Sequence, residues 1–467
     1  MEYTKTKYSS LALLLKSSSH AMKYLYDTHA FSAQNHAPSY WRDTAPALAD
    51  FSSLTEDTTC EVAVIGSGYT GMMAAYRLAT KYQIDVKVFE AAQPGWGASG
   101  RNGGFCCMGS TKLSYQQMIR RYGLEAAKDF FAAQKQSVAF VKSFLETHNI
   151  DADATGNGEI ELAHKANRMD DLRQEQEFLA QTFGHETHIL SPDQLGEIGL
   201  SGYFHGGLHN PTGFGLHPLK YARGLAKLLR DTGIEIFGNS PVTKWEKHVD
   251  GHHLHTPQGI VKVNHVIMAT NGYTAENLSS NAAGKLLPAL SSILVTRPLS
   301  KQEQQDQGWT NTTTVYDSRI LLHYFRMLPD GRFLFGGRGG TDSSAKGEKL
   351  AEKRVRADFE ALFPAWSHIE HTHFWQGFIC LANDLVPYIG PINKDKTAWA
   401  SLAYHGNGVA MSGWAGRALA DEIAGDRTQS KLPAVFTKRF NKFPLPALRL
   451  QYLKAAYAFY QIKDEWL

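Results

Sequence analysis

The sequence predicts an α/β protein in which a parallel-sheet domain is interrupted by a second, α+β domain with a mixed sheet. A glycine-rich turn stands between a Val- and Ile-rich segment and an amphipathic helical segment near residues 60–82, which is typical of a βαβ unit. Strand–turn–helix segments recur around 215–275 and at 376–430, and other helical and strand-rich material separates them. The first domain is therefore assembled from segments that are far apart in the chain.

Composition excludes several classes of protein. The chain has 467 residues, 43% hydrophobic and 20% charged, and a net charge of +3, which gives no basis for nucleic-acid binding. No apolar run reaches the roughly 18 residues of a membrane span. We expect a helical arm over residues 1–20, with a transit peptide as the alternative. Four cysteines without CxxC or zinc-ligand spacing predict a reduced, cytoplasmic protein without a metal.

The first unit has the spacing of a Rossmann-type dinucleotide fingerprint. We expect a strand from Glu61 to Ile65, a helix from about Thr70 to Tyr82 and a strand from Val86 to Glu90. The turn between them is Gly66-Ser67-Gly68-Tyr69-Thr70-Gly71. The first glycine permits the tight turn, the second lets a pyrophosphate approach, and the third lets the helix pack on the strand.

An acidic residue completes this fingerprint. Glu90 lies nineteen residues after Gly71, where a carboxylate binds ribose hydroxyls, and the helix N-terminus attracts the pyrophosphate. The segment predicts a dinucleotide site with Gly66, Gly68, Tyr69, Thr70, Gly71 and Glu90 as binding residues. A glycine-rich turn in an unrelated α/β fold is the alternative.

Four further segments resemble the FAD-dependent D-amino acid oxidase superfamily. They are "GWGASGRNGG" at 95–104, "VNHVIMATNGYT" at 263–274, "GRFLFGGRGG" at 331–340 and "YHGNGVAMSGWAGRALADEI" at 404–423. Within the superfamily, "PSYWRDTAP", "YFRMLPDGRFLFGG" and the C-terminal tail resemble gamma-glutamylputrescine oxidases. The resemblance implies a glutathione-reductase-like FAD-binding domain with an inserted mixed-sheet substrate domain.

The resemblance also implies a division of the chain and a set of FAD contacts. We expect a lead at 1–55, an FAD domain at 56–115, 205–275 and 376–430, a substrate domain at 116–204 and 276–375, and a helical tail at 431–467. Residues 114–200 read as mainly helical, and Val242 is expected in a strand beside the adenine. The remaining expected FAD contacts are Ala98, Ser99, Arg101, Asn102, Gly103, Gly104, Val242, Ala269, Thr270, Gly272, Gly406, Asn407, Gly408 and Val409.

Glycine at 97–104 would permit close approach to FAD and leave backbone N–H groups facing it. In this interpretation Ser99 and Arg101 bond the cofactor and Asn102 meets a ring heteroatom. Cys380 stands where some relatives attach flavin covalently, but its flanking residues differ, so we expect non-covalent FAD. His217 before Pro218 replaces the acid of many relatives, which leaves its role open.

The substrate residues are expected to position an amine more than to act as acid and base. Tyr324, His405 and Arg338 are the candidate catalytic residues, the last as a clamp for a substrate carboxylate. The other candidates for aromatic walls are Phe105, Phe325, Trp375 and Tyr404. His323 is a second candidate proton acceptor and Arg326 a second clamp; for each residue the alternative is an ordinary structural role.

The predicted function is FAD-dependent oxidation of an amine C–N bond, with a substrate like gamma-glutamylputrescine and O2 as acceptor, giving H2O2. The alternatives are a D-amino acid, sarcosine or glycine oxidase, a quinone-linked amino acid dehydrogenase and an NAD-only dehydrogenase. A non-enzymatic flavin-binding protein for assembly or sensing stays open.

Overall fold

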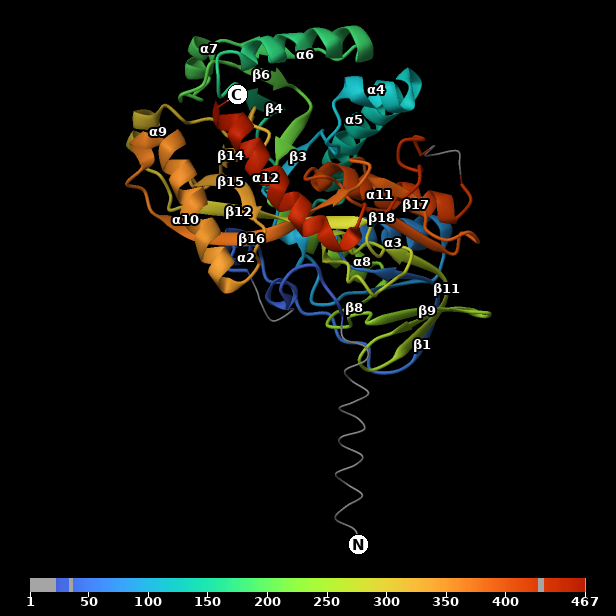
Figure 1. Cartoon of the computed structure of the whole chain (residues 1–467). Helices are drawn as coiled ribbons and strands as arrows, with labels where there is room; N and C mark the ends of the chain where they lie inside the picture. The colour runs from blue at the N-terminus through green and yellow to red at the C-terminus, as the bar shows by residue number, and fades with distance from the viewer. Residues whose placement is uncertain (1–21, 33–36, 427–431, 467) are drawn as a thin grey trace.

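The chain forms two large sheets joined by a small third one, as the computed structural model shows (Figure 1). The structure describes residues 22–32, 37–426 and 432–466. This arrangement confirms the predicted α/β class. The helical arm expected over residues 1–20 lies outside the described residues.

The first sheet contains the predicted βαβ unit. Its strands run in the order β17 (Tyr388–Pro391), β18 (Ala398–Leu402), β11 (Ile260–Met268), β1 (Thr58–Ile65), β2 (Val86–Phe89) and β8 (Glu235–Phe237), with β10 (Gly251–His255) and β9 (Lys244–His248) attached through β11. From β18 to β8 all neighbours pair in parallel. Gly66 ends β1 with φ +101°, a conformation that favours glycine, so the turn is fixed by its residue type.

Helices cover this sheet and bring two turns together. They are α3 (Tyr69–Tyr82), α5 (Leu124–Thr147), α8 (Pro218–Asp231) and α11 (Gly408–Ile423), joined at the edge by α4 (Tyr115–Tyr122). A Cβ on Gly416 of α11 would lie 2.3 Å from the Thr70 carbonyl oxygen of α3, so the two helices are in backbone contact. This contact places the first turn of α3 against the middle of α11, and the Thr70 side chain also bonds Tyr404, just before α11, at 2.7 Å.

The second sheet gathers strands from both halves of the chain. Its order is β16 (His371–Ala382), β12 (Leu286–Thr296), β15 (Phe333–Gly340), β14 (Tyr324–Met327), β13 (Thr314–Asp317), β4 (Glu159–Leu162), β6 (Gly207–Asn210) and β5 (His188–Leu190). The small sheet pairs β3 (Phe105–Cys107) with β7 (Gly213–Gly215). Strand β6 and the second half of β16 pair within the second sheet, although both lie outside the predicted substrate segments at 116–204 and 276–375. The predicted domain limits stay a prediction.

One face of the second sheet is a packed aromatic core. Phe325 and Phe335 pack with Phe359 of α10 (Ala345–Leu362) and with Trp366 of η5 (Pro364–Trp366). The other helices around this sheet are α6 (Arg168–Phe183), α7 (Pro192–Glu197) and α9 (Lys301–Gln307). Neighbouring residues of a strand face opposite sides of the sheet. The residues that alternate with Phe325 on β14 and with Phe335 on β15 therefore face away from this core, towards the first sheet.

The described parts of the lead and of the tail both pack on the second sheet. The lead contains η2 (Thr28–Phe31) and α2 (Tyr40–Thr44), and the tail forms η6 (Pro446–Leu448) and α12 (Arg449–Trp466), drawn in red across the front of Figure 1. Asp464 of α12 accepts hydrogen bonds from the Ile320 and Leu321 amides, both at 2.9 Å, which holds the helix end on the second sheet. In the described part of the chain, no helix has the length and apolar character needed to cross a membrane.

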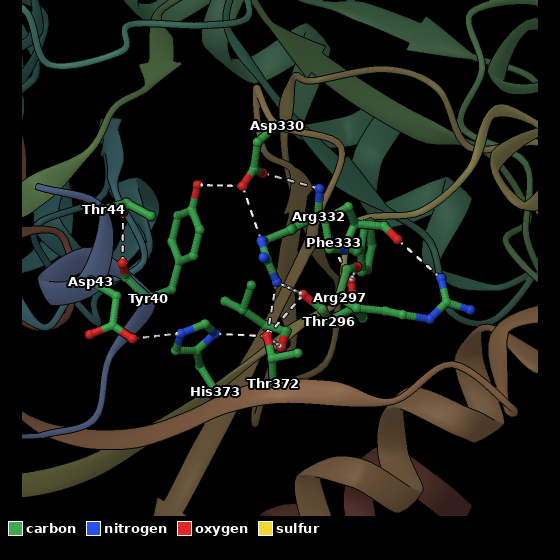
Figure 2. Close-up of polar contacts among 12 residues, drawn as sticks. Tyr40, Asp43, Thr44, Thr296, Arg297, Asp330, Arg332, Phe333, Thr372 and His373 are labelled. Carbon is green, nitrogen blue, oxygen red and sulfur yellow. Dashed lines mark hydrogen bonds and ion pairs between the residues drawn. The ribbon is translucent and has the colours of Figure 1, made fainter.

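A polar network fixes α2 against the second sheet, as Figure 2 shows. The Tyr40 hydroxyl donates to Asp330 in the turn between β14 and β15, and Arg332 bonds the same carboxylate at 3.0 Å. His373 of β16 contacts Asp43 at 3.1 Å. The network positions Trp41, between Tyr40 and Asp43, beneath the glycine-rich loop.

One prediction of local structure was confirmed and one was wrong. Residues 114–200 are mainly helical, as expected, with the short strands β4 and β5 between the helices. Val242 is buried but belongs to no strand; β9 begins two residues later, at Lys244.

Candidate functional site

A single large cavity of about 910 Å³ runs between the two sheets. It begins at the fingerprint turn, passes the glycine-rich loop and the N-terminus of α11, and reaches the second sheet and α12. The predicted site residues that line it are Gly66, Gly68, Tyr69, Thr70, Glu90, Ala98, Ser99, Arg101, Asn102, Gly103, Val242, Ala269, Thr270, Tyr324, Arg338, His405, Gly406, Asn407, Gly408 and Val409. The structure thus brings most of the predicted residues to one space.

Three predicted glycines support the cavity without lining it. A Cβ on Gly71 would lie 2.0 Å from the Gly66 carbonyl oxygen, and one on Gly104 would lie 2.0 Å from that of Leu216. Gly272 packs against Phe378 of β16 in the same way, at 3.0 Å. These positions require glycine because backbones or strands meet there.

The glycine-rich loop is held from behind through four successive carbonyl groups. The Trp375 indole donates to the Arg101 carbonyl and the Trp41 indole to the Asn102 carbonyl, both at 2.8 Å. Arg326 Nε donates to the Gly103 carbonyl at 3.3 Å, and the Leu216 amide donates to that of Gly104 at 2.8 Å. Four separate segments therefore fix the loop on the side away from the cavity.

The loop's own polar groups bond mostly within the loop. Asn102 donates to the carbonyls of Ala98 and Ser99, and its side-chain oxygen accepts from the Gly104 amide at 2.8 Å. Arg101 Nε donates to the Trp96 carbonyl and its guanidinium stacks 4.3 Å from the Trp96 ring. Ser99 Oγ accepts from the Tyr69 amide. The backbone N–H groups that were expected to face FAD are also partly used within the loop. Those of Gly100, Arg101, Asn102 and Gly104 donate to acceptors inside it.

Two helix N-termini open into the cavity, and the residue that precedes each helix provides no side-chain cap, although Ser99 Oγ accepts from the Tyr69 amide of α3. Gly68 precedes α3 and Asn407 precedes α11, and neither supplies a capping hydrogen bond. Uncapped N–H groups and the helix dipole favour a negatively charged or electron-rich ligand at both points. The Asn407 side chain instead donates to the Met108 carbonyl at 2.6 Å, which ties α11 to the segment after the glycine-rich loop.

His405 provides an unpaired ring beside α11. The residue is 1% exposed, and neither ring nitrogen has a hydrogen-bond partner among the residues that the structure describes. Burial, assisted by the charge of Lys112, lowers the pKa of His405 to about 3. A neutral imidazole of this kind is a weak proton acceptor, so in this structure it is better suited to hydrogen bonding than to holding a proton.

Glu90 lies one residue beyond β2, at the end of the cavity that also contains Val242. Its Oε2 accepts from the amide and hydroxyl of Ser67, both at 2.8 Å, and its Oε1 accepts from the Ala92 amide. The carboxylate is thereby held in one orientation beside the fingerprint turn.

These features fit FAD. The uncapped helix ends suit its pyrophosphate and the electron-rich edge of its ring, Glu90 suits its ribose, and the His405 nitrogens and Ser412 Oγ are buried cavity groups without partners. The Cys380 thiol also lines the cavity, but burial raises its pKa, so it carries no thiolate for a covalent bond at neutral pH.

Several residues predicted for the substrate side have other contacts. Phe325 lies in the aromatic core, while Trp375 and Arg326 hold the glycine-rich loop. Burial alone would lower the pKa of His323, but the hydrogen bonds that it donates to the Asp317 and Asp358 carboxylates raise this pKa to about 9, and the residue does not line the cavity. The structural alternative is therefore the better interpretation of these four residues.

His217 is the N-cap of helix α8. Its Nδ1 accepts from the Lys220 amide at 3.1 Å at the start of α8, and its Nε2 contacts the Thr44 hydroxyl at 3.0 Å. The Nδ1 lone pair serves as the cap acceptor, so the capping role does not require a carboxylate.

Tyr324, Phe105, Tyr404 and Arg338 remain at the cavity. The Tyr324 hydroxyl bonds Ser291 at 2.8 Å, and its ring packs edge-on against Phe105. Tyr404 bonds Thr70 and Ser401, both at 2.7 Å. Arg338 forms no ion pair among the residues that the structure describes, so its charge is available to a ligand.

Sequence reasoning missed a polar wall on the second sheet. Glu159, Glu161 and Tyr316 line the cavity from β4 and β13, and Glu175 joins them from α6. Alternation in "EIEL", with acids between apolar residues, was the available signal for a strand with one polar face. Lys112 and the α12 side chains Tyr452, Tyr457 and Tyr460 were also missed, and no local pattern identifies them.

Comparison with known proteins agrees with this geometry. Residues 61–422 match the family described as "DAO: FAD dependent oxidoreductase". A Haemophilus influenzae protein named "Probable oxidoreductase OrdL" is 31% identical over 91% of this chain and 98% of its own length. The gamma-glutamylputrescine oxidoreductase of Escherichia coli is 27% identical over 92% of this chain and 98% of its own. The glycine oxidase of Geobacillus kaustophilus shares the fold, with a TM-score of 0.68 at 21% identity over 82% of this chain and 99% of its own.

Replacing Gly103 by valine should weaken flavin retention more than folding. A Cβ at this position would lie 2.8 Å from the Tyr324 ring, so the larger side chain displaces the loop surface that faces the cavity. We expect a lower ratio of 450 nm to 280 nm absorbance after gel filtration, roughly the flavin and protein bands, with a small change in melting temperature. Full flavin content and activity in this variant would contradict the account of the loop.

The His323 ion pairs should make stability fall in mild alkali. The folded protein holds the imidazolium proton up to about pH 9, whereas the unfolded chain releases it near the ordinary pKa of 6.5. Between these two pH values the folded state binds more protons than the unfolded chain. The contribution of the His323 ion pairs to the free energy of unfolding is therefore complete below pH 6.5 and is lost as pH rises through 9. Urea unfolding at a series of pH values should show this decline in the free energy of unfolding, and the decline should be smaller in a His323→Gln variant. Equal pH dependence in the two proteins would refute the prediction.

Proposed function

Because the chain belongs to the DAO family of FAD-dependent oxidoreductases, we propose that it oxidises the C–N bond of an amine resembling gamma-glutamylputrescine, with O2 as the electron acceptor. The supporting observation is the continuity of the cavity from the fingerprint turn to the second sheet. One end fits a dinucleotide and the other presents aromatic and charged side chains to a small molecule. The products of this reaction are an aldehyde, ammonia and H2O2.

Bound FAD would supply the acceptor for the hydride that leaves the carbon next to the nitrogen. Gly66, Gly68, Glu90 and the glycine-rich loop would hold the cofactor. We propose that it is bound without a covalent link, because the neighbouring Cys380 thiol is protonated.

The chain itself would position the amine and exclude water. Tyr324, Phe105 and Tyr404 form an apolar wall beside the loop, and such a wall favours the neutral amine that the reaction needs. The α11 N-terminus would stabilise negative charge that develops next to it. Arg338 would bind a substrate carboxylate such as that of a glutamyl group.

The four cysteines support the proposed cytoplasmic location. Cys60, Cys106, Cys107 and Cys380 are all buried free thiols, which suits a reducing compartment.

A substrate panel tests this proposal directly. The FAD-loaded protein is mixed anaerobically with gamma-glutamylputrescine, polyamines, sarcosine, glycine and D-amino acids, and flavin bleaching is recorded; O2 is then admitted and peroxide measured. We expect bleaching by the gamma-glutamyl amine and one peroxide for each aldehyde formed.

Other outcomes would replace the proposal. Bleaching by a D-amino acid alone would assign another substrate class. Reoxidation by a quinone or dye without peroxide would assign a dehydrogenase. No bleaching by any compound would leave a flavoprotein without this activity.

A further inference from the structure

Three carboxylates form one wall of the cavity without a cation partner. Glu159 and Glu161 point from β4, and Glu175 approaches from α6. Within the described residues none of them forms an ion pair. The charge of Arg168 reaches Glu161, but Arg168 is already bonded to Asp171 at 3.0 Å. The wall is therefore an acidic surface that lacks its counterion.

The position of these groups follows from strand alternation. Ile160 and Leu162 of β4 belong to the aromatic core, so Glu159 and Glu161 must face the cavity. Glu159 is 8% exposed, which is exceptional for a carboxylate with no cation beside it. A soluble protein retains such a costly group where a ligand completes it.

Burial confirms that the uncompensated charge is costly. It raises the pKa of Glu159 to about 8 and that of Glu161 to about 7, and mutual repulsion adds to both shifts, since Glu161 acts on Glu159 and Glu175 on Glu161. Tyr316 donates a hydrogen bond to Glu161 at 3.1 Å, which orients this carboxylate but does not neutralise it. A cation would lower these pKa values and restore the charged form.

Strand register relates this wall to the proposed flavin position. Glu161 pairs with Tyr316, and Tyr316 pairs with Tyr324 on the next strand. The Tyr324 ring in turn contacts Gly103 of the glycine-rich loop. Two strand spacings separate Glu161 from Tyr324, which is about 10 Å.

We propose that Glu159, Glu161 and Glu175 bind a second ammonium group of the substrate, about two strand spacings from Tyr324, the residue beside which the oxidised carbon would lie. The preferred substrates are then extended amines with a cationic far end, such as diamines, polyamines or amines carrying an amino-acid head. This inference rests on the proposed function, and it names the residues that select the substrate class.

The test compares octane-1,8-diamine with octylamine, two straight-chain probes that differ by one terminal ammonium group. Binding to the FAD-loaded protein is measured anaerobically by calorimetry, and flavin reduction is followed separately. We expect the diamine to bind more tightly by about 10- to 100-fold, the range for a charge-assisted hydrogen bond. Glu161→Gln should reduce this ratio towards one, because the amide still accepts from Tyr316 but carries no charge.

A matched variant controls for general effects. Glu177→Gln removes an exposed carboxylate two residues from Glu175 on α6, and it should keep the full ratio. Glu159→Gln serves as a second site variant if Glu161→Gln is poorly folded.

Each outcome decides between the two proposals. If the native protein prefers the diamine, Glu161→Gln loses this preference, and no amine reduces the flavin, the acidic wall is supported and the proposed activity is overturned. Flavin reduction with equal binding of both probes supports the activity and overturns the wall. The wall is also overturned if the ratio of diamine to monoamine affinity is the same in the native protein, Glu161→Gln and Glu159→Gln. Both proposals are overturned if the protein shows neither diamine selectivity nor flavin reduction.

Discussion

The structure depends on the attachment of four successive carbonyl groups in the loop at 101–104. Their donors come from α2, β14, β16 and the segment before α8, which are far apart in the sequence. Trp41 also contacts both of the other side-chain donors: its indole lies edge-on to that of Trp375 at 6.2 Å, and the Arg326 guanidinium lies 5.7 Å from its ring. The loop therefore takes its shape only when both sheets and the lead segment are assembled around it.

This attachment explains the use of glycine and of buried polar side chains together. Bonding the carbonyls on the rear side leaves a smooth surface on the cavity side, where a flat ring system can lie against it. Arg326 is fully buried and has no carboxylate partner among the described residues, so burial lowers its pKa to about 10; its bonds are to backbone oxygens. Such a costly residue is retained because it holds the loop between the two sheets.

The local part of this design was predictable from the sequence. Gly66, Gly71 and Glu90 satisfy requirements of a single βαβ unit, namely a positive φ, a close helix–strand contact and a strand end, and these are visible in a few adjacent residues. The face occupied by His323, Phe325 or Trp375 depends on strand pairing with distant segments, so composition alone did not distinguish core from cavity. The acidic wall was missed for the same reason: it exists because β4 pairs with β13, more than 150 residues later.

The affinity of a Trp41→Phe variant for FAD tests the central claim most directly. Phenylalanine keeps an aromatic ring in the packed site but removes the donor to the Asn102 carbonyl, which leaves a buried acceptor unpaired at a cost of about 1–3 kcal/mol. If the rear attachment shapes the cofactor surface, titration of the apoprotein should show a dissociation constant raised by about tenfold or more. An unchanged FAD dissociation constant, with only the unfolding free energy reduced, would contradict the account.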